Sequence, residues 1–485
     1  MKNHRLRQLL ADFGSKQVVL TWAIQMVLLL SLTFSLVACS LQQPLQQPLL
    51  LLEHSAQGKS QIYAVHPDGS HLTLIAEFTQ SNWYWLSPNG KYLAFLALGE
   101  QNTSYDLRIL EMASGTIIEE LPQVRQTWSE IIPWEENVAW SPQEIKLAFL
   151  RSPESRNEPD IFMYDLSTQT VTALTNDKAV ERAMSWAPDG EQLAFVTWDG
   201  CEQSDCLPEE EYWNVDVMNV DGSNRHRLIA FQDLELLPAD LWTASLCNLT
   251  WSPDGKQIAF ENECRSLSGP PYWKEVFVTS VDGSELKRLT DFTADYDLNA
   301  STLPDIAFRY SLQWLPQNSS LLIGYTKIAV TPTGFHYGGF LTVNRDREIR
   351  VSLPETRGTI GSTAIWSPSK EYVAWHTEDI SESRMTIPKP TLVGRMDIDR
   401  VAVIEALTNL PAGSLCSTSK IYWSFDSRFL AYDADQPGFN CFDKERGQEI
   451  VVVSIPDGQI FHVAESLTGE VEILGWIPES NEGKP

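Results

Sequence analysis

Short runs of alternating large and small apolar residues recur along the chain, each preceded by a tight polar turn. The best-formed copy reads Trp-Ser-Pro-Asp-Gly-Lys-Gln-Ile-Ala-Phe over residues 251–260. Pro fixes φ, Asp hydrogen-bonds its own backbone and Gly accepts a positive φ, so Pro-Asp-Gly predicts a reversal between two strands. Side chains alternate along a strand, so Ile258 and Phe260 face one side and Ala259 the other, where a neighbouring sheet can approach closely.

A second strand pair follows the first. After residues 251–260 come Val276-Phe277-Val278, then Asp282-Gly283, then an apolar run over residues 286–290. Asp-Gly between alternating apolar runs is the strongest short signal for a hairpin. Each copy therefore predicts four antiparallel strands, which is the content of one propeller blade.

The copies recur through most of the chain. Successive Trp residues that open them are 55, 46, 65, 63, 52, 57 and 53 residues apart. A period of this size indicates stacked supersecondary units within one fold. The residues expected to anchor the repeats are Trp85, Trp140, Trp186, Trp251, Trp314, Trp366, Trp423 and Trp476.

This phrase resembles the TolB-like, WD-like β-propeller repeats, in which Trp-Ser-Pro-Asp-Gly-Lys-x-Ile-Ala-Phe is followed by an apolar strand, Asp-Gly and Arg-Leu-Thr. The resemblance covers roughly Leu49 to Pro478. It implies an all-β fold consisting of a single β-propeller. The family includes envelope scaffolds, peptidase propellers and a few lyases, so function must be argued from the site and not from the fold.

The two ends of the repeat region predict how the ring closes. Residues 49–53 resemble the second strand of a blade and residues 471–474 a first strand, so one blade would be shared between the termini. Seven complete units plus this composite give eight four-stranded blades. The alternative is seven blades, with the unit at Trp314 as an insertion, because it has Gln-Asn-Ser-Ser in place of Asp-Gly.

The N-terminal residues predict an extracytoplasmic protein. Basic residues precede the apolar run Val18–Ala38, and Cys39 follows it directly. The pattern resembles a bacterial lipoprotein signal that is cut before Cys39, whose thiol is then lipidated. The alternative is an uncleaved membrane-spanning helix over the 21 residues of the run. In both cases the propeller lies outside the cytoplasm, because the basic flank stays inside.

We therefore divide the chain into four segments. They are a signal peptide over 1–38, a lipid-anchored tether over 39–48, the propeller over 49–478 and a C-terminal tail over 479–485. The eight residues after Ser40 reach at most about 28 Å when extended, so the propeller would lie close to the periplasmic face of a membrane or to the cell surface. We expect a monomer.

Six cysteines remain once Cys39 is set aside. Two pairs lie at nearly equal distances on either side of a predicted turn, which places their members on neighbouring antiparallel strands, and the third pair would close a small loop. Three disulfides fit an oxidising compartment. Free thiols or a metal site are the alternatives, but the lack of a Cys-x-x-Cys pair and the scatter of the histidines argue against metal, and we expect no cofactor. The predicted pairs are Cys247–Cys264, Cys416–Cys441 and Cys201–Cys206.

The chain carries a formal net charge of −28 at pH 7. Such an acidic protein is a poor partner for nucleic acid or for anionic lipid, since both repel it. The acidity can also serve solubility alone.

Insertions predict where a binding site lies. In a propeller, the turns between strands one and two and between strands three and four share one face, and the other connections share the opposite face. Almost every insertion belongs to this second set, and aromatic residues beside carboxylates there suit the recognition of a protein or a glycan. Trp213 and Trp273 could instead cap the outer strands of their own blades. The candidate face comprises Trp198, Tyr212, Trp213, Trp242, Tyr272, Trp273, Asp295, Tyr296 and Asp297.

These observations favour a protein-binding scaffold in the cell envelope. The alternatives are a glycan-binding module and a carbohydrate-active, lyase-like enzyme, because paired carboxylates on different blades leave no spacing signature. We assign no catalytic residue: the chain has no Gly-x-Ser-x-Gly, no His-Glu-x-x-His and no phosphate-binding loop, and no hydrolase domain follows Pro485. In TolB itself, an α/β domain precedes a six-bladed propeller. That arrangement differs from the one predicted for this chain, so the resemblance implies only a generic binding role.

Overall fold

The computed structural model describes residues 47–478 with gaps, the longest of which cover 127–137, 199–212, 231–245, 263–274, 291–304 and 435–448. The predicted signal peptide, Cys39 and most of the tether lie outside the described residues, as does the C-terminal tail. Among the residues that are described, no helix is long and apolar enough to cross a membrane.

The described strands form eight antiparallel sheets. Six of them each contain four consecutive strands. In chain order these are β4 (Ser81–Leu86), β5 (Tyr92–Leu98), β6 (Ser104–Glu111) and β7 (Thr116–Gln126); β8 (Val138–Trp140), β9 (Lys146–Arg151), β10 (Asp160–Asp165) and β11 (Thr170–Ala173); β12 (Val180–Trp186), β13 (Gln192–Trp198), β14 (Asn214–Asn219) and β15 (His226–Ile229); β16 (Leu246–Trp251), β17 (Gln257–Asn262), β18 (Val276–Ser280) and β19 (Leu286–Arg288); β20 (Asp305–Trp314), β21 (Ser320–Val330), β22 (Phe335–Asn344) and β23 (Arg347–Val351); β29 (Ile421–Trp423), β30 (Phe429–Ala434), β31 (Glu449–Ser454) and β32 (Ile460–Val463).

A seventh sheet has a divided first strand. Both β24 (Thr359–Ile360) and β25 (Ile365–Trp366) pair with β26 (Tyr372–Ile380), which is followed by β27 (Thr386–Asp397) and β28 (Arg400–Val403). The unit at Trp314, the possible insertion, forms the complete sheet β20–β23.

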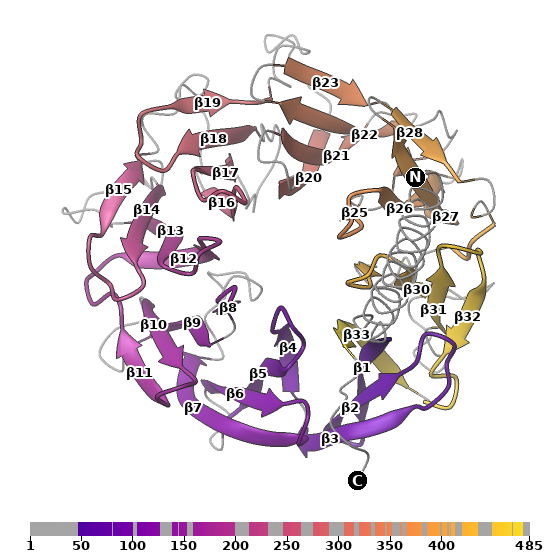
Figure 1. Cartoon of the computed structure of the whole chain (residues 1–485), viewed down its shortest axis with the longest axis horizontal. Helices are drawn as coiled ribbons and strands as arrows, with labels where there is room; N and C mark the ends of the chain where they lie inside the picture. The colour runs from indigo at the N-terminus through magenta and orange to yellow at the C-terminus, as the bar shows by residue number, and fades with distance from the viewer. Residues whose placement is uncertain are drawn as a thin grey trace, which may run out of the picture. The chain divides into compact units, whose positions relative to one another are not determined.

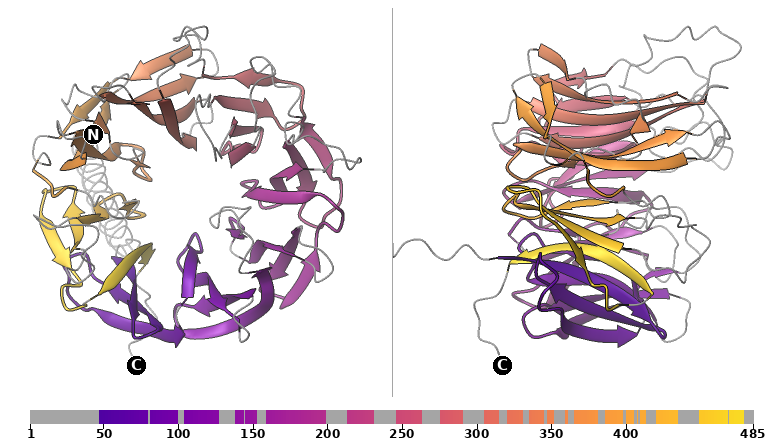
Figure 2. Two further views of the ribbon diagram at one scale, coloured as in Figure 1. Left: turned by 180° about the vertical axis from the view of Figure 1, so that it is seen from behind. Right: turned by 90° about the vertical axis from the view of Figure 1, so that its right-hand side faces the viewer.

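The eighth sheet joins the two ends of the described chain. Its order is β3 (Thr73–Thr79), β2 (Lys59–Val65), β1 (Pro48–Ala56) and β33 (Glu470–Pro478), and Pro48 pairs with Pro478. Figure 2 shows the indigo β1 beside the yellow β33. The predicted sharing of one sheet between the N-terminal and C-terminal repeats is therefore correct.

The sheets follow one another around a ring, as Figure 1 shows for residues 48–478. The first strands contact their neighbours in sequence from β4 through β8, β12 and β16 to β20, and β33 touches both β29 and β4. The predicted fold class, a single all-β propeller, is confirmed.

The Ser-Pro-Asp-Gly phrase forms the turn between first and second strands. In the turn from β16 to β17, the Gly255 N–H donates to Ser252 O (2.9 Å), and Gly255 has a φ of 67°. The hydroxyl of the fully buried Ser252 accepts the Gln257 N–H (2.9 Å) and donates to Asp254 Oδ1 (2.7 Å). Ser87, Ser141, Ser367 and Ser424 accept the equivalent N–H in four other sheets, which explains the serine in the phrase.

In six of the sheets, the repeated Trp is hydrogen-bonded to the sheet before it. Trp251 Nε1 donates to Ser185 O in β12 (3.0 Å), and Trp186 Nε1 donates to Ala139 O in β8 (3.0 Å). The acceptor is the carbonyl of the residue directly before the anchoring position in the preceding sheet. Four further indoles make the same bond: Trp140 to Trp85 O, Trp314 to Thr250 O, Trp423 to Ile365 O and Trp476 to Tyr422 O, at 2.8–3.1 Å.

Trp85 is not the anchor of its sheet, and this expectation was wrong. Leu86 pairs with Leu93, as Trp186 pairs with Leu193, so Leu86 holds the anchoring position and Trp85 the position before it. The copy reads Trp-Leu-Ser-Pro, with one residue between Trp and Ser that the other copies lack. The extra residue moves the indole to the other face of β4, because side chains alternate along a strand.

Large and small side chains alternate where sheets meet. Ile258 and Phe260 of β17 pack in one cluster with Ala194 and Val196 of β13. Leu193 and Phe195, on the other face of β13, pack with Ala148 of β9. The predicted alternation is confirmed, and all these side chains are fully buried.

The register contradicts the spacing argument for the disulfides. Cys247 pairs with Glu261, and not with Cys264, because Trp251 pairs with Ile258 and a β-bulge shifts the register between residues 247 and 250. Asn248 lies in this bulge with a φ of 52°. The other five cysteines lie outside the described residues, so the disulfides remain predictions.

A buried histidine lies between the sheets that contain β26 and β30. His376 is 4% exposed, its Nδ1 lies 2.8 Å from Thr391 Oγ1, and its ring makes an edge contact with Tyr432. Burial lowers the pKa of His376 to about 4, because the protonated ring cannot be solvated there.

We expect Trp251→Phe and Trp186→Phe each to lower the free energy of unfolding by about 1–3 kcal/mol, because each leaves a buried carbonyl without its donor and removes ring volume. Denaturant unfolding measures this. The control Tyr92→Phe keeps a ring that stacks on Trp140 and should cost less than about 0.5 kcal/mol. Equal effects in all three variants would contradict a special role for the indole N–H.

Acid should weaken the fold through His376. The unfolded chain takes up a proton near pH 6.5 and the folded chain only near pH 4, so this contribution to stability is complete above about pH 6.5 and is lost as pH falls toward 4, by up to about 3 kcal/mol. Unfolding measured from pH 4 to 7.5 should show a smaller slope for His376→Gln. The exposed His226→Gln serves as the control, and an unchanged slope in the His376 variant would exclude this residue as the cause.

Candidate binding site

The two faces of the ring differ in how they are closed. We call the face with the turns between first and second strands the turn face, and the opposite face the connection face. On the turn face, two turns touch the preceding sheet closely: a Cβ added at Gly90 would lie 2.7 Å from Ile477, and one at Gly190 would lie 1.9 Å from Gln143. Ser369 N–H donates across to Ser427 Oγ (2.9 Å). These contacts leave the connection face as the place for a site.

Two of the nine predicted face residues lie in the part of the chain that the structure describes. Trp198 ends β13 and Trp213 directly precedes β14, so both lie at the connection face. Their ring centroids are 6.1 Å apart with planes inclined by 35°. The structure therefore brings these two together. Tyr212, Trp242, Tyr272, Trp273, Asp295, Tyr296 and Asp297 lie outside the described residues.

Trp213 packs inside the protein, whereas Trp198 is partly exposed. Trp213 is 8% exposed and belongs to the core cluster between the β12–β15 and β16–β19 sheets. The guanidinium of the buried Arg182 lies 3.8 Å from its ring centroid, and Arg182 Nη2 donates to Leu246 O (3.3 Å). The alternative that Trp213 is a packing residue fits this geometry. Trp198 packs against the same cluster but remains partly exposed.

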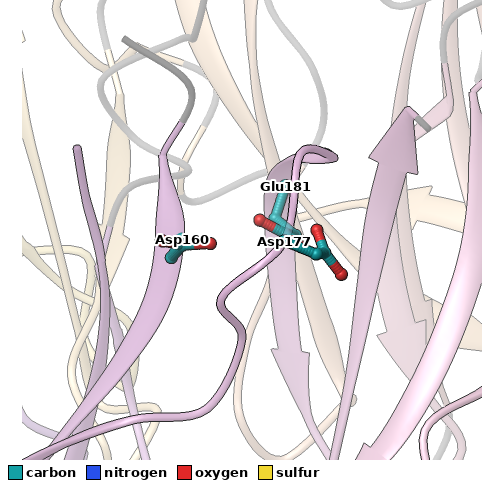
Figure 3. A group of neighbouring side chains, drawn as sticks. All are labelled: Asp160, Asp177 and Glu181. Carbon is teal, nitrogen blue, oxygen red and sulfur yellow. The ribbon is translucent and has the colours of Figure 1, made fainter. Parts of the chain in front are cut away.

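Three carboxylates converge at the same end of the β12–β15 sheet, on the side opposite to Trp198 and Trp213. Asp160 begins β10, Glu181 lies in β12, and Asp177 lies in the connection between β11 and β12. One carboxylate oxygen of each lies within 4.8 Å of the others. Figure 3 shows the three side chains. Asp160 and Glu181 are buried, whereas the Asp177 side chain is 48% exposed. The cluster links two neighbouring sheets.

Arg225 neutralises much of this negative charge. Its Nη1 lies 2.7 Å from Asp177 Oδ2 and 3.3 Å from Glu181 Oε1, and its Nε lies 3.1 Å from Asp216 Oδ2. Arg227 Nε binds the other oxygen of Asp216 at 2.9 Å. Burial by itself would lower the pKa of Arg225, but Asp216, Asp177 and Glu181 outweigh it and raise the pKa.

The carboxylates have the oxygen chemistry that Ca²⁺, Mg²⁺ or Mn²⁺ prefers. In this arrangement, however, Arg225 already supplies a positive charge to two of the three. We therefore describe the group as an ion-pair network with one exposed member, Asp177. Sequence reasoning missed it because its acidic residues come from two repeats and have no common spacing.

Comparison with known proteins adds to this description. A scan against protein-family models found no match, and a search of curated proteins found no relative. Among solved structures, the chain is similar to dipeptidyl peptidase 4 of Porphyromonas gingivalis, with 12% identity, a TM-score of 0.51, and coverage of 86% of this chain and 58% of that one. The chain has a β-propeller fold. An identity this low shows the fold alone.

Three further structures are less similar. A prolyl endopeptidase matches with 12% identity and a TM-score of 0.49 over 81% of this chain and 50% of its own. Oligogalacturonate lyase from Vibrio parahaemolyticus matches with 12% identity and a TM-score of 0.46 over 87% of this chain and 99% of its own. TolB of Acinetobacter baumannii is also similar, at a TM-score of 0.32 with 12% identity, covering 80% of this chain and 83% of that one. The chain thus spans about half the length of the peptidases.

We expect Arg225→Met to lower the free energy of unfolding by about 2–4 kcal/mol, because it leaves the buried Glu181 without this cation while Arg227 still holds Asp216. Denaturant unfolding at pH 7 measures the loss. Lys59→Met, which removes an exposed ion pair with Glu77, should cost less than about 1 kcal/mol. A loss at Arg225 no larger than that at Lys59 would show that the network contributes little to stability.

Proposed function

We propose that this protein is an extracytoplasmic, lipid-anchored β-propeller that binds another envelope protein through its connection face. The observation that carries the proposal is the contrast between the faces. Several turns on the turn face contact neighbouring sheets, whereas the connection face presents the partly exposed Trp198 and, on the other side of the same sheet, the exposed Asp177. Aromatic side chains with a neighbouring charge are typical of binding surfaces.

The position of the chain ends supports an outward-facing site. Pro48 pairs with Pro478, and the adjacent Ile477 touches the turn at Gly90, so the chain enters the ring at its turn face. The nine residues from Cys39 to Gln47 reach at most about 30 Å. A lipid on Cys39 would hold the turn face toward the membrane and leave the connection face accessible to a partner.

Charge favours a basic partner. The chain carries a net charge of −28, and Asp177 is exposed at the connection face. Complementary charge speeds encounter and selects among partners. We therefore expect the bound surface of the partner to carry Lys or Arg near an apolar contact for Trp198.

The proposal is tested by crosslinking mass spectrometry on intact cells. The full-length protein is compared with Trp198→Ala/Asp177→Asn and with Phe425→Ser, which changes a 46% exposed residue in the turn from β29 to β30. Crosslinks to one protein should fall at least about tenfold in the first variant, as expected for a contact worth more than 1.4 kcal/mol, and persist in the second.

Crosslinks that survive in the Trp198→Ala/Asp177→Asn variant would contradict the proposed face. Loss in both variants would indicate impaired folding, which the thermal unfolding of each purified variant checks. If the wild type gives no protein crosslink but binds envelope glycans, the glycan-binding alternative replaces the proposal.

A further inference from the structure

Exposed apolar side chains gather on one face of the ring. Among the described residues, seven large apolar side chains are exposed, and of these only Leu98, which ends β5, lies at the connection face. Ile145 and Phe425 lie in turns between first and second strands. The other four lie at the start of a fourth strand, directly after the turn from the third strand, which belongs to the turn face as well. They are Leu74, Ile117, Ile118 and Val171.

The start of the fourth strand differs between two halves of the ring. Fourth strands form the outer edge, as Figure 1 shows, and their second residue is apolar in five consecutive sheets and charged in the next three. An apolar residue is not needed here for folding, because complete four-stranded sheets form with charged ones. We call the five apolar positions the apolar rim. In ring order the apolar residues are Val401, Phe461, Leu74, Ile117 and Val171, and the charged ones are Arg227, Lys287 and Glu348.

The described chain begins in the middle of the apolar rim. The composite sheet is the third of the five, and it contains Pro48, which pairs with Pro478 at the turn face. The nine residues from Cys39 to Gln47 reach at most about 30 Å. Either form of the predicted membrane attachment, a lipid on Cys39 or a spanning helix over Val18–Ala38, would therefore hold the ring at the centre of its apolar half.

We propose that the apolar rim, together with Ile145 and Phe425, is the surface with which the ring lies on the bilayer that holds its N-terminus. This inference rests on the membrane attachment in the proposed function. Exposed apolar side chains leave water when they enter the boundary between headgroups and acyl chains. Each contributes little alone, but a short tether keeps all of them at high effective concentration beside the bilayer. The charged half of the rim then tilts away from the membrane.

The chemistry of this surface favours lipid over a second copy of the chain or another protein. Leu74, Ile117 and Val171 are aliphatic, whereas the residues that dominate protein interfaces are Trp, Tyr and Arg. A second copy would bring another net charge of −28 to the contact and repel the first. A bilayer of lipids without net charge presents no such repulsion, so we commit to that partner.

Photocrosslinking from the lipid tests the proposal. The full-length protein is reconstituted in phosphatidylcholine nanodiscs that contain a phospholipid with a diazirine on its acyl chain, and mass spectrometry locates the adducts formed on illumination. Only side chains that enter the bilayer meet the reactive group. We expect adducts on the peptides that contain Ile117 and Val171 to exceed those on the peptides that contain Arg227 and Lys287 at least about tenfold.

A variant and a matched control examine the same surface. Leu74→Ser/Ile117→Ser/Val171→Ser should lower the adducts at the unchanged Ile145 and Phe425 at least about threefold, because fewer apolar contacts hold the ring on the bilayer. The control Leu98→Ser changes a side chain of similar exposure, 40%, at the connection face and should leave the labelling intact. Thermal unfolding of both purified variants checks that each is folded.

The outcomes separate this contact from the attachment itself. Adducts confined to residues before Pro48, or spread equally over both halves of the rim, overturn the proposal while the attachment stands, and so does unchanged labelling in the triple variant. Loss of the wild type from the nanodiscs shows that the attachment is wrong, and this inference fails with it. Crosslinks between two copies through the apolar rim would assign it to self-association and overturn the proposal. None of these outcomes depends on a protein partner at the connection face.

Discussion

The hydrogen bond from an indole N–H to a carbonyl of the preceding sheet is the interaction on which this ring depends. A four-stranded sheet has no means of fixing its angle to a neighbour by hydrophobic contact alone, because apolar packing is not directional. The bond supplies that direction at the inner edge, where Trp251, for example, reaches Ser185 O. The Ser-Pro-Asp-Gly turn beside each Trp fixes the end of the same strand, so one short phrase determines both the fold of a sheet and its place in the ring.

Most of the architecture could be predicted because the phrase repeats. The composite sheet was expected from residues 49–53 and 471–474, and β1 and β33 lie side by side. Spacing failed where one residue changes the register. The extra Leu86 moved Trp85 off the anchoring position. Cys247 missed the predicted pairing because Trp251 pairs with Ile258, which centres the turn earlier than expected, and the bulge at Asn248 shifts the register further. Such insertions alter the sequence little but reverse the faces to which side chains point.

The candidate site was less predictable than the fold. Trp198 and Trp213 were expected at the connection face because the connections there are long, and they are neighbours. The sequence offered packing as an alternative for Trp213, but it could not show that the guanidinium of Arg182, from another strand, lies against this ring. The network around Arg225 joins residues of separate repeats and follows only from the three-dimensional arrangement.

The composite sheet also has a mechanical consequence. β1 lies between β2 and β33 and pairs with both along nearly its whole length. A pull on the chain ahead of Pro48 acts along β1, so both ladders of hydrogen bonds bear the load together in shear and cannot be unzipped one bond at a time. The first described strand of the chain is therefore held by two ladders that must fail together.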